Sequence, residues 1–190
     1  SLKLNFSGTC YTAHIYTNNV ALPNGVYTSS NLPGYITGSG SLRATGANST
    51  GLWTGAGVNN NWSMGNNWNN NVVPIFPIGL TFAGNTRLTN TNDFTGITAS
   101  SLTFDAAAGA FTLNGNPITL NGNIGFNGNP AAPVTQTVNL NMAFGASQTI
   151  DTPANGNLTV GGAITTGNDL IKQDVGTLTL GGTNVIEDLV

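Results

Sequence analysis

Between Ile118 and Leu180 the chain repeats an apolar–polar–apolar triplet every twenty residues. The four triplets are Ile118-Thr119-Leu120, Val138-Asn139-Leu140, Leu158-Thr159-Val160 and Leu178-Thr179-Leu180. Two further series keep the same step, namely Ile124, Phe144 and Ile164, and Ile150 and Leu170. A period near twenty residues is typical of a coiled stack of strands. The repeat therefore predicts an all-β protein, a parallel β-solenoid in which each coil holds short strands joined by Gly/Asn corners.

Earlier in the chain the same pattern has a slightly longer step. Leu80-Thr81-Phe82 and Leu102-Thr103-Phe104 begin 22 residues apart, and Ile124 follows Leu102 by another 22. We therefore expect the solenoid to span residues 80–190, with about five coils of about 20–22 residues each.

The composition of a coil follows from the alternation of side chains along a strand. Leu, Ile, Val and Phe are expected to point inward, while Gly and Asn occupy corners because they tolerate positive φ. The triplets place Thr119, Asn139, Thr159 and Thr179 in a single outward file. A regular file of threonines is how some ice-binding proteins hold ordered water, but Asn139 interrupts this one, and threonine also suits exposed strands by β-propensity alone.

Residues 47–79 form a linker followed by a segment rich in Trp and Asn. All three tryptophans of the chain, Trp53, Trp62 and Trp68, lie here. A solenoid exposes the apolar interior of its first coil unless that end is covered, and large aromatic rings with a polar N–H suit such a cap. The alternative is a carbohydrate platform, in which the three indole faces stack on sugar rings beside Asn amides.

Residues 1–46 differ from the rest of the chain. Leu2 to Phe6 alternate as in a half-buried strand, and Asn18-Asn19 and Pro23-Asn24-Gly25 are turn signals. We expect an antiparallel β meander of four or five short strands. The polar stretch 44–51 is the best domain boundary in the chain.

Charge and chemistry exclude several classes of function. Charged residues make up 6% of the chain, with four cations in total, so nucleic acid is not expected as a partner. We also expect stability to depend weakly on pH and salt. No apolar run is long enough to span a bilayer, and no leader pattern begins the chain, so we expect any signal peptide to have been removed already.

No cofactor, metal or catalytic residue is predicted. The only histidine, His14, and the only cysteine, Cys10, exclude a His-based triad, a multi-His metal site and an internal disulfide. Asp151 and Asp169 are the only acids spaced near one coil apart, with Lys172 as the one nearby cation. That is too little for a lyase or a glycosidase, so we expect no enzymatic activity.

Several motifs resemble the autotransporter-associated β-strand repeat proteins of bacterial surfaces. Four stretches resemble the beginning of that repeat, namely Trp53-Thr54-Gly55, Asn60-Asn61-Trp62-Ser63, Gly65-Asn66-Asn67-Trp68 and the stretch from Leu80 to Asn90. Gly176-Thr177-Leu178-Thr179-Leu180-Gly181-Gly182 resembles its signature strand, and residues 1–46 resemble the segment that usually ends such a region. The resemblance implies a right-handed parallel β-helix, exported to the cell surface, structural or adhesive, with no shared catalytic residues.

Two departures from that family are expected: these 190 residues include no outer-membrane barrel, and the ending segment comes before the beginning segment. The second departure suggests that residues 1–46 dock on the final coil of a preceding copy, because an open strand edge is rarely left exposed. Such a head-to-tail contact does not close and makes a filament. The candidate interface residues are Leu2, Leu4, Phe6, Leu178, Leu180, Val185 and Ile186.

We therefore expect an extracellular or cell-surface structural protein that self-assembles head to tail into a fibre or matrix. The alternative function is a surface adhesin or carbohydrate-binding module that binds glycans through Trp53, Trp62 and Trp68. For residues 1–46, the simpler alternatives are another cap, or that the chain is part of a longer array.

Overall fold

A computed structural model describes residues 1–12, 14–22, 25–44 and 51–190. The chain divides into two compact units, residues 1–49 and 50–190. The division falls within the polar stretch 44–51 predicted as the boundary, most of which lies outside the described residues.

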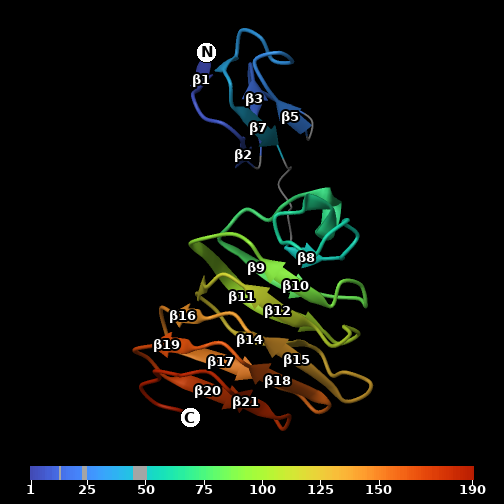
Figure 1. Ribbon diagram of the computed structural model, residues 1–190, viewed down its shortest axis with the longest axis vertical. Helices are drawn as coiled ribbons and strands as arrows, with labels where there is room; N and C mark the ends of the chain where they lie inside the picture. Colours follow the sequence, from blue (N-terminus) through green and yellow to red (C-terminus); the bar gives the residue numbers. More distant parts are fainter. Residues whose placement is uncertain (13, 23–24, 45–50) are drawn as a thin grey trace. The chain divides into compact units, whose positions relative to one another are not determined.

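The larger unit is built almost entirely of short strands (Figure 1). In chain order they are β8 (Leu52–Trp53), β9 (Ile78–Phe82), β10 (Thr89–Asn92), β11 (Ile97–Asp105), β12 (Thr112–Gly115), β13 (Ile118–Leu120), β14 (Ile124–Asn127), β15 (Val134–Val138), β16 (Met142–Phe144), β17 (Gln148–Asp151), β18 (Gly156–Val160), β19 (Ile164–Thr166), β20 (Leu170–Gln173) and β21 (Leu178–Leu180). Two single-turn 3₁₀ helices, η1 (Gly65–Asn67) and η2 (Asn69–Asn71), lie near its start.

These strands form a three-sided parallel β-solenoid. One side is a five-stranded sheet in the order β10-β12-β15-β18-β21. The long strand β11 supplies the other two sides of its coil, because its first half pairs with β13 and its second half with β14. The two remaining sides then continue separately as β13-β16-β19 and β14-β17-β20. The predicted all-β parallel β-solenoid is confirmed.

The register of the coils differs from the twenty-residue series. Leu80 pairs with Leu102 and Leu102 with Ile124, as the 22-residue step predicts. Ile124, however, pairs with Ile150, a step of 26, and Ile118 pairs with Met142, a step of 24. The triplet that begins at Ile118 lies on a different side from those at Val138, Leu158 and Leu178. The predicted file Thr119, Asn139, Thr159 and Thr179 is therefore wrong, and only Thr159 and Thr179 are neighbours.

Insertions at the corners explain this error. The turn between β14 and β15 holds Gly128 to Pro133, and the extra residues lengthen that coil. A fixed step in the sequence then connects similar triplets that belong to different sides. Only the last step, Leu158 to Leu178, keeps both the twenty-residue spacing and the pairing.

The core runs along the solenoid axis as stacked inward side chains. Phe82, Phe104 and Phe126 occupy equivalent positions in successive coils, with ring centroids 5.8 Å apart at each step. Leu80, Leu102 and Ile124 form a second inward stack and are almost fully buried. Each aromatic ring contributes both buried apolar area and tilted ring contacts, so neighbouring coils are held together by packing as well as by backbone pairing.

The corners require particular residues. As expected for Gly and Asn at corners, φ is positive at Gly115, Gly128 and Asn155. Gly115 has φ 110°, and a Cβ atom there would clash with the backbone of Asn92 in the coil above. Glycine at this corner therefore satisfies both a left-handed backbone and close contact between coils.

Residues 52–79, which we call the tryptophan segment, cover the first coil. Trp53 pairs with Phe82 through β8 and β9, and a bridge between Asn61 and Thr91 places the next part of the segment over β10. The indoles of Trp53, Trp62 and Trp68 pack edge to face and join the same core cluster as Phe82. The segment is thus an irregular additional coil that closes one end of the apolar interior.

The smaller unit contains β1 (Leu2–Leu4), β2 (Thr9–Thr12), β3 (Tyr16–Thr17), β4 (Val20–Ala21), β5 (Gly25–Tyr27), β6 (Ile36–Gly38) and β7 (Ser41–Ala44). The prediction of an antiparallel meander is only partly right. The pairs β3–β4 and β5–β7 are antiparallel, but β1–β6 and β2–β7 are parallel. Alternation of side chains along a strand is the same in both arrangements, so the sequence pattern does not distinguish them.

Candidate functional site

In the last coil of the solenoid, one edge of strand β21 has no partner strand among the described residues. β21 is the edge strand of the five-stranded sheet, and the chain continues around the coil by bridges from Val185 to Thr165 and from Leu189 to Leu170. Backbone bonds from Leu158 N–H to Thr177 O and from Gly181 N–H to Val160 O direct alternate groups of β21 toward β18. The peptide groups of Leu178 and Leu180 therefore point away from the solenoid, as at any sheet edge.

Apolar side chains surround this edge. Leu178, Leu180 and Ile186 pack against the core and are half-buried. Val185 and Leu189 are 61% and 63% exposed. The other end of the solenoid contrasts with this one, since its three tryptophans are buried. One end of the solenoid is closed, and the other presents unpaired backbone beside apolar side chains.

The smaller unit has a similar edge. β1 and β2 follow one another in the chain and pair in parallel with β6 and β7, which also follow one another. This is the pairing of two stacked solenoid coils, with residues 1–12 as one layer and residues 36–44 as the other. β7 is covered on its second side by β5, whereas β1 and β2 have no second partner strand among the described residues.

The predicted interface residues fall at these two edges. Leu2 and Phe6 are 51% and 39% exposed, whereas Leu4 is buried within the smaller unit. On the solenoid, Leu178, Leu180 and Ile186 are half-buried and Val185 is exposed. Leu189, which is not among the predicted interface residues, belongs to the same edge. The sequence spacing could have identified it, because Leu189 follows Leu170 by nineteen residues, close to the length of one coil.

The tryptophans are not accessible to a glycan. Trp53 and Trp62 have 0% and Trp68 has 1% of their surface exposed. The Trp62 indole N–H donates to Asn90 Oδ1 at 2.7 Å, and the Trp68 indole N–H donates to the Trp62 carbonyl at 2.6 Å. The interpretation of these residues as a sugar platform is therefore wrong, because covering the apolar end of the solenoid requires the same ring faces.

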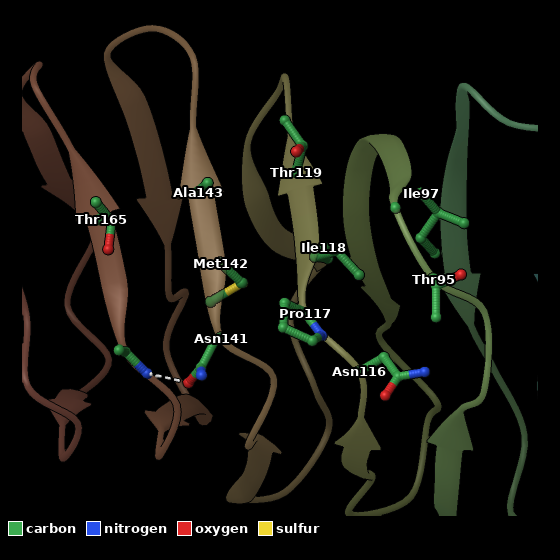
Figure 2. Close-up of a pocket in the computed structure, with 12 residues that line it drawn as sticks. Thr95, Ile97, Asn116, Pro117, Ile118, Thr119, Asn141, Met142, Ala143 and Thr165 are labelled. Atoms are coloured by element: carbon green, nitrogen blue, oxygen red, sulfur yellow. Dashed lines mark hydrogen bonds between the residues drawn. The ribbon is translucent and has the colours of Figure 1, made fainter.

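A shallow groove of about 410 Å³ follows the side formed by β11, β13, β16 and β19 (Figure 2). Figure 2 shows Ile97, Ile118 and Met142 in successive coils along the groove, and all three side chains are buried. At its edge the Ala163 N–H donates to Asn141 Oδ1 at 2.9 Å. The lining side chains are Thr, Asn, Ala, Ile, Pro and Met, with no charged group. The polar groups of the groove are therefore hydroxyls, amides and backbone groups.

One pair of carboxylates meets between the fourth and fifth coils. Asp151 ends β17, and Asp174 lies in the turn after β20, which pairs with β17. Partial burial, a hydrogen bond with Asp174 and its negative charge raise the pKa of Asp151, against the opposing effect of Lys172. Lys172 Nζ donates to the Gln173 and Asp174 carbonyls at 2.7 Å and 2.6 Å, which holds the ammonium beside the pair. Asp169, the acid that the sequence spacing connects with Asp151, is not its partner.

Among residues 1–12, 14–22, 25–44 and 51–190, no group of three or more His, Cys, Asp or Glu side chains is arranged to bind a metal ion. Cys10 is a free, exposed thiol. Within the same described residues, no helix is long and apolar enough to cross a membrane.

Comparisons with known proteins give no relative for this chain. No protein-family model matches it, and no curated protein or solved structure is significantly similar to it. The resemblance to autotransporter-associated repeat proteins stays a prediction from the motifs.

Proposed function

We propose that this chain is an extracellular structural protein that assembles head to tail into a fibre. In the fibre, β1 and β2 of one copy extend the last coil of the preceding copy by parallel pairing. The observation that carries the proposal is the parallel pairing of β1 with β6 and of β2 with β7, because it makes the first residues of the chain a solenoid layer with a free edge.

Chemical similarity of the two edges supports this pairing. Each presents unpaired main chain beside exposed or half-buried apolar residues, Leu2 and Phe6 on one and Ile186 and Leu189 on the other. Adding a strand to an open edge is a general mode of association, in which main-chain hydrogen bonds supply affinity and alternate side chains supply specificity. Because the two surfaces differ, one contact leaves the next edge free and growth continues.

The composition of the chain also suits a fibre. With a formal charge of −3 distributed over 190 residues, copies repel one another weakly when they stack. The closed tryptophan end of the solenoid prevents pairing there, so association is directed to one end of each solenoid.

The test is sedimentation velocity over a concentration series, together with negative-stain microscopy. We expect the full chain to form regular filaments, and Leu2→Lys or Leu189→Lys to leave monomers, because either change places an ammonium group at the buried contact. A monomer at every concentration, or filaments unaffected by both changes, would contradict the proposal.

Matched controls separate this effect from a general loss of apolar surface. Tyr16→Lys alters a side chain that is 60% exposed in the smaller unit, on the β3–β4 hairpin. Val58→Lys alters one that is 85% exposed in the tryptophan segment, away from the last coil. Both variants should still form filaments, and far-UV circular dichroism should confirm that all four variants remain folded.

A further inference from the structure

A central column of threonines runs the full height of the five-stranded sheet. Its members are aligned by the strand register, Thr89 with Thr112, Thr112 with Thr137, Thr137 with Thr159 and Thr159 with Thr179. We call Thr89, Thr112, Thr137, Thr159 and Thr179 the threonine column. In Figure 1 its five strands, β10, β12, β15, β18 and β21, lie one below another. Asn139, which interrupts the file predicted from the sequence, is not in the column.

Each coil also carries a second outward polar residue two positions from the column. The pairs are Thr89 and Thr91, Thr112 and Asn114, Thr135 and Thr137, Asn157 and Thr159, and Thr177 and Thr179. The second residue follows the column residue on β10 and β12 but precedes it in the three later coils, so only the threonine column itself is continuous from coil to coil. The intervening residues point inward, as Leu113 and Leu158 do.

The hydroxyl groups of the threonine column are available to solvent. All five side chains are exposed or half-buried, and none of their hydroxyls has a hydrogen-bond partner among the residues that the structure describes. No outward side chain on these five strands is charged. The face thus combines free hydroxyls and γ-methyl groups on a rigid sheet, without an ion that would impose its own hydration shell.

The spacing of this array is set by the sheet. Neighbouring coils place threonines about 4.8 Å apart along the column, and the second residue of each pair lies about 6.6 Å away along the strand. The spacing along the column is close to an oxygen repeat in the lattice of hexagonal ice. Hydroxyls held at such intervals anchor waters in lattice-like positions, while the methyl groups between them order the neighbouring waters without competing hydrogen bonds.

We propose that this face binds ice. The occupant is the ice lattice itself, because a neutral and periodic surface complements a neutral and periodic array of hydroxyls. This inference does not depend on fibre formation.

The test uses the full chain in a nanolitre osmometer and in an ice-affinity partition experiment. We expect the protein to produce thermal hysteresis, to shape growing ice crystals and to concentrate in the ice fraction. Thr137→Lys, at the middle of the column, should abolish the shaping and return the protein to the liquid fraction. Thr137→Val, which keeps both the shape and a methyl group, should retain part of the hysteresis.

The matched control is Thr103→Lys. Thr103 is also half-buried and points outward from a central strand, but it lies on β11 between Thr81 and Gly125, outside the threonine column. The Thr103→Lys variant should bind ice as the unchanged protein does. Absence of hysteresis and of partition into ice in the unchanged protein would overturn the proposal, as would equal loss in Thr137→Lys and Thr103→Lys when both have unchanged melting temperatures.

Retention of the protein on crystalline cellulose or chitin, in the absence of any effect on ice, would assign the face to a solid neutral polysaccharide and would likewise overturn ice binding.

Discussion

At the residue scale, buried polar side chains in this solenoid replace missing main-chain pairs. Gln136 is fully buried, and its Oε1 accepts the Phe111 N–H at 2.7 Å while its Nε2 donates to the Gly109 carbonyl at 3.0 Å. Both backbone groups lie in the corner before β12. The side chain thus satisfies two groups that would otherwise be buried without partners.

Gln136→Leu should lower the free energy of unfolding by about 2 kcal/mol or more, because it leaves a buried N–H and a buried C=O unpaired. Chemical denaturation followed by tryptophan fluorescence measures the change. Gln148→Leu is the control, since Gln148 is 3% exposed but makes no side-chain hydrogen bond among the described residues. Equal destabilisation by the two changes would show that the hydrogen bonds of the Gln136 amide add nothing to the free energy of unfolding.

At the scale of elements, coils are joined by pairing, by stacked side chains and, at one place, by two carboxyl groups. Asp151 at the end of β17 and Asp174 after β20 are brought together only because these strands pair. The raised pKa of Asp151 follows from partial burial and from the neighbouring Asp174, which both favour the neutral carboxylic acid. The contact therefore stabilises the folded coil most when Asp151 holds its proton.

The sign of the pH effect follows from linkage. Because the folded-state pKa of Asp151 is above its unfolded value, its contribution to stability is present at low pH and is lost as pH rises through the folded-state pKa. Asp151→Asn should therefore raise the melting temperature at about pH 7 and leave it nearly unchanged at about pH 3. Scanning calorimetry of both proteins across this range measures it. A lower melting temperature of the variant at neutral pH would show that the charged form is the favoured one.

At the scale of the whole solenoid unit, stability is distributed along one axis. Each coil contacts only its neighbours, so a terminal coil lacks half of the contacts of a central one. Three buried tryptophans replace the missing contacts of the first coil. On the last coil, the side chains at the corresponding place, Leu178, Leu180 and Ile186, are only half-buried. The two ends should therefore differ in local stability.

Hydrogen exchange of the monomer should be faster for β21 and residues 185–189 than for β15, because the last coil opens without disturbing the others. Mass spectrometry of peptides that cover these segments measures the difference. In filaments, the protection of β21 should rise toward that of β15. Equal protection of both segments in the monomer would mean that the solenoid unfolds as a single cooperative unit.

The fold class and the closed end could be predicted from the sequence, because both depend on local patterns. Alternation of Leu, Ile, Val and Phe with Thr and Asn, interrupted by Gly corners, leaves few structures other than a stack of short strands. Three tryptophans within sixteen residues at the start of such a stack predict a large apolar contact. Their complete burial, which excludes a glycan site there, was visible only in the structure.

Tertiary structure decided the register, and with it every surface that could carry function. Corners of different length change the step from 20 to 26 residues, so Thr119 lies on one side of the solenoid while Thr112 and Thr137 lie on another. The continuous threonine column and the contact of Asp151 with Asp174 are consequences of that register. Strand direction in residues 1–46 was decided in the same way, because a strand alternates identically whichever direction its partner runs. Local alternation determines that a strand forms, whereas only pairing in space determines which residues become neighbours.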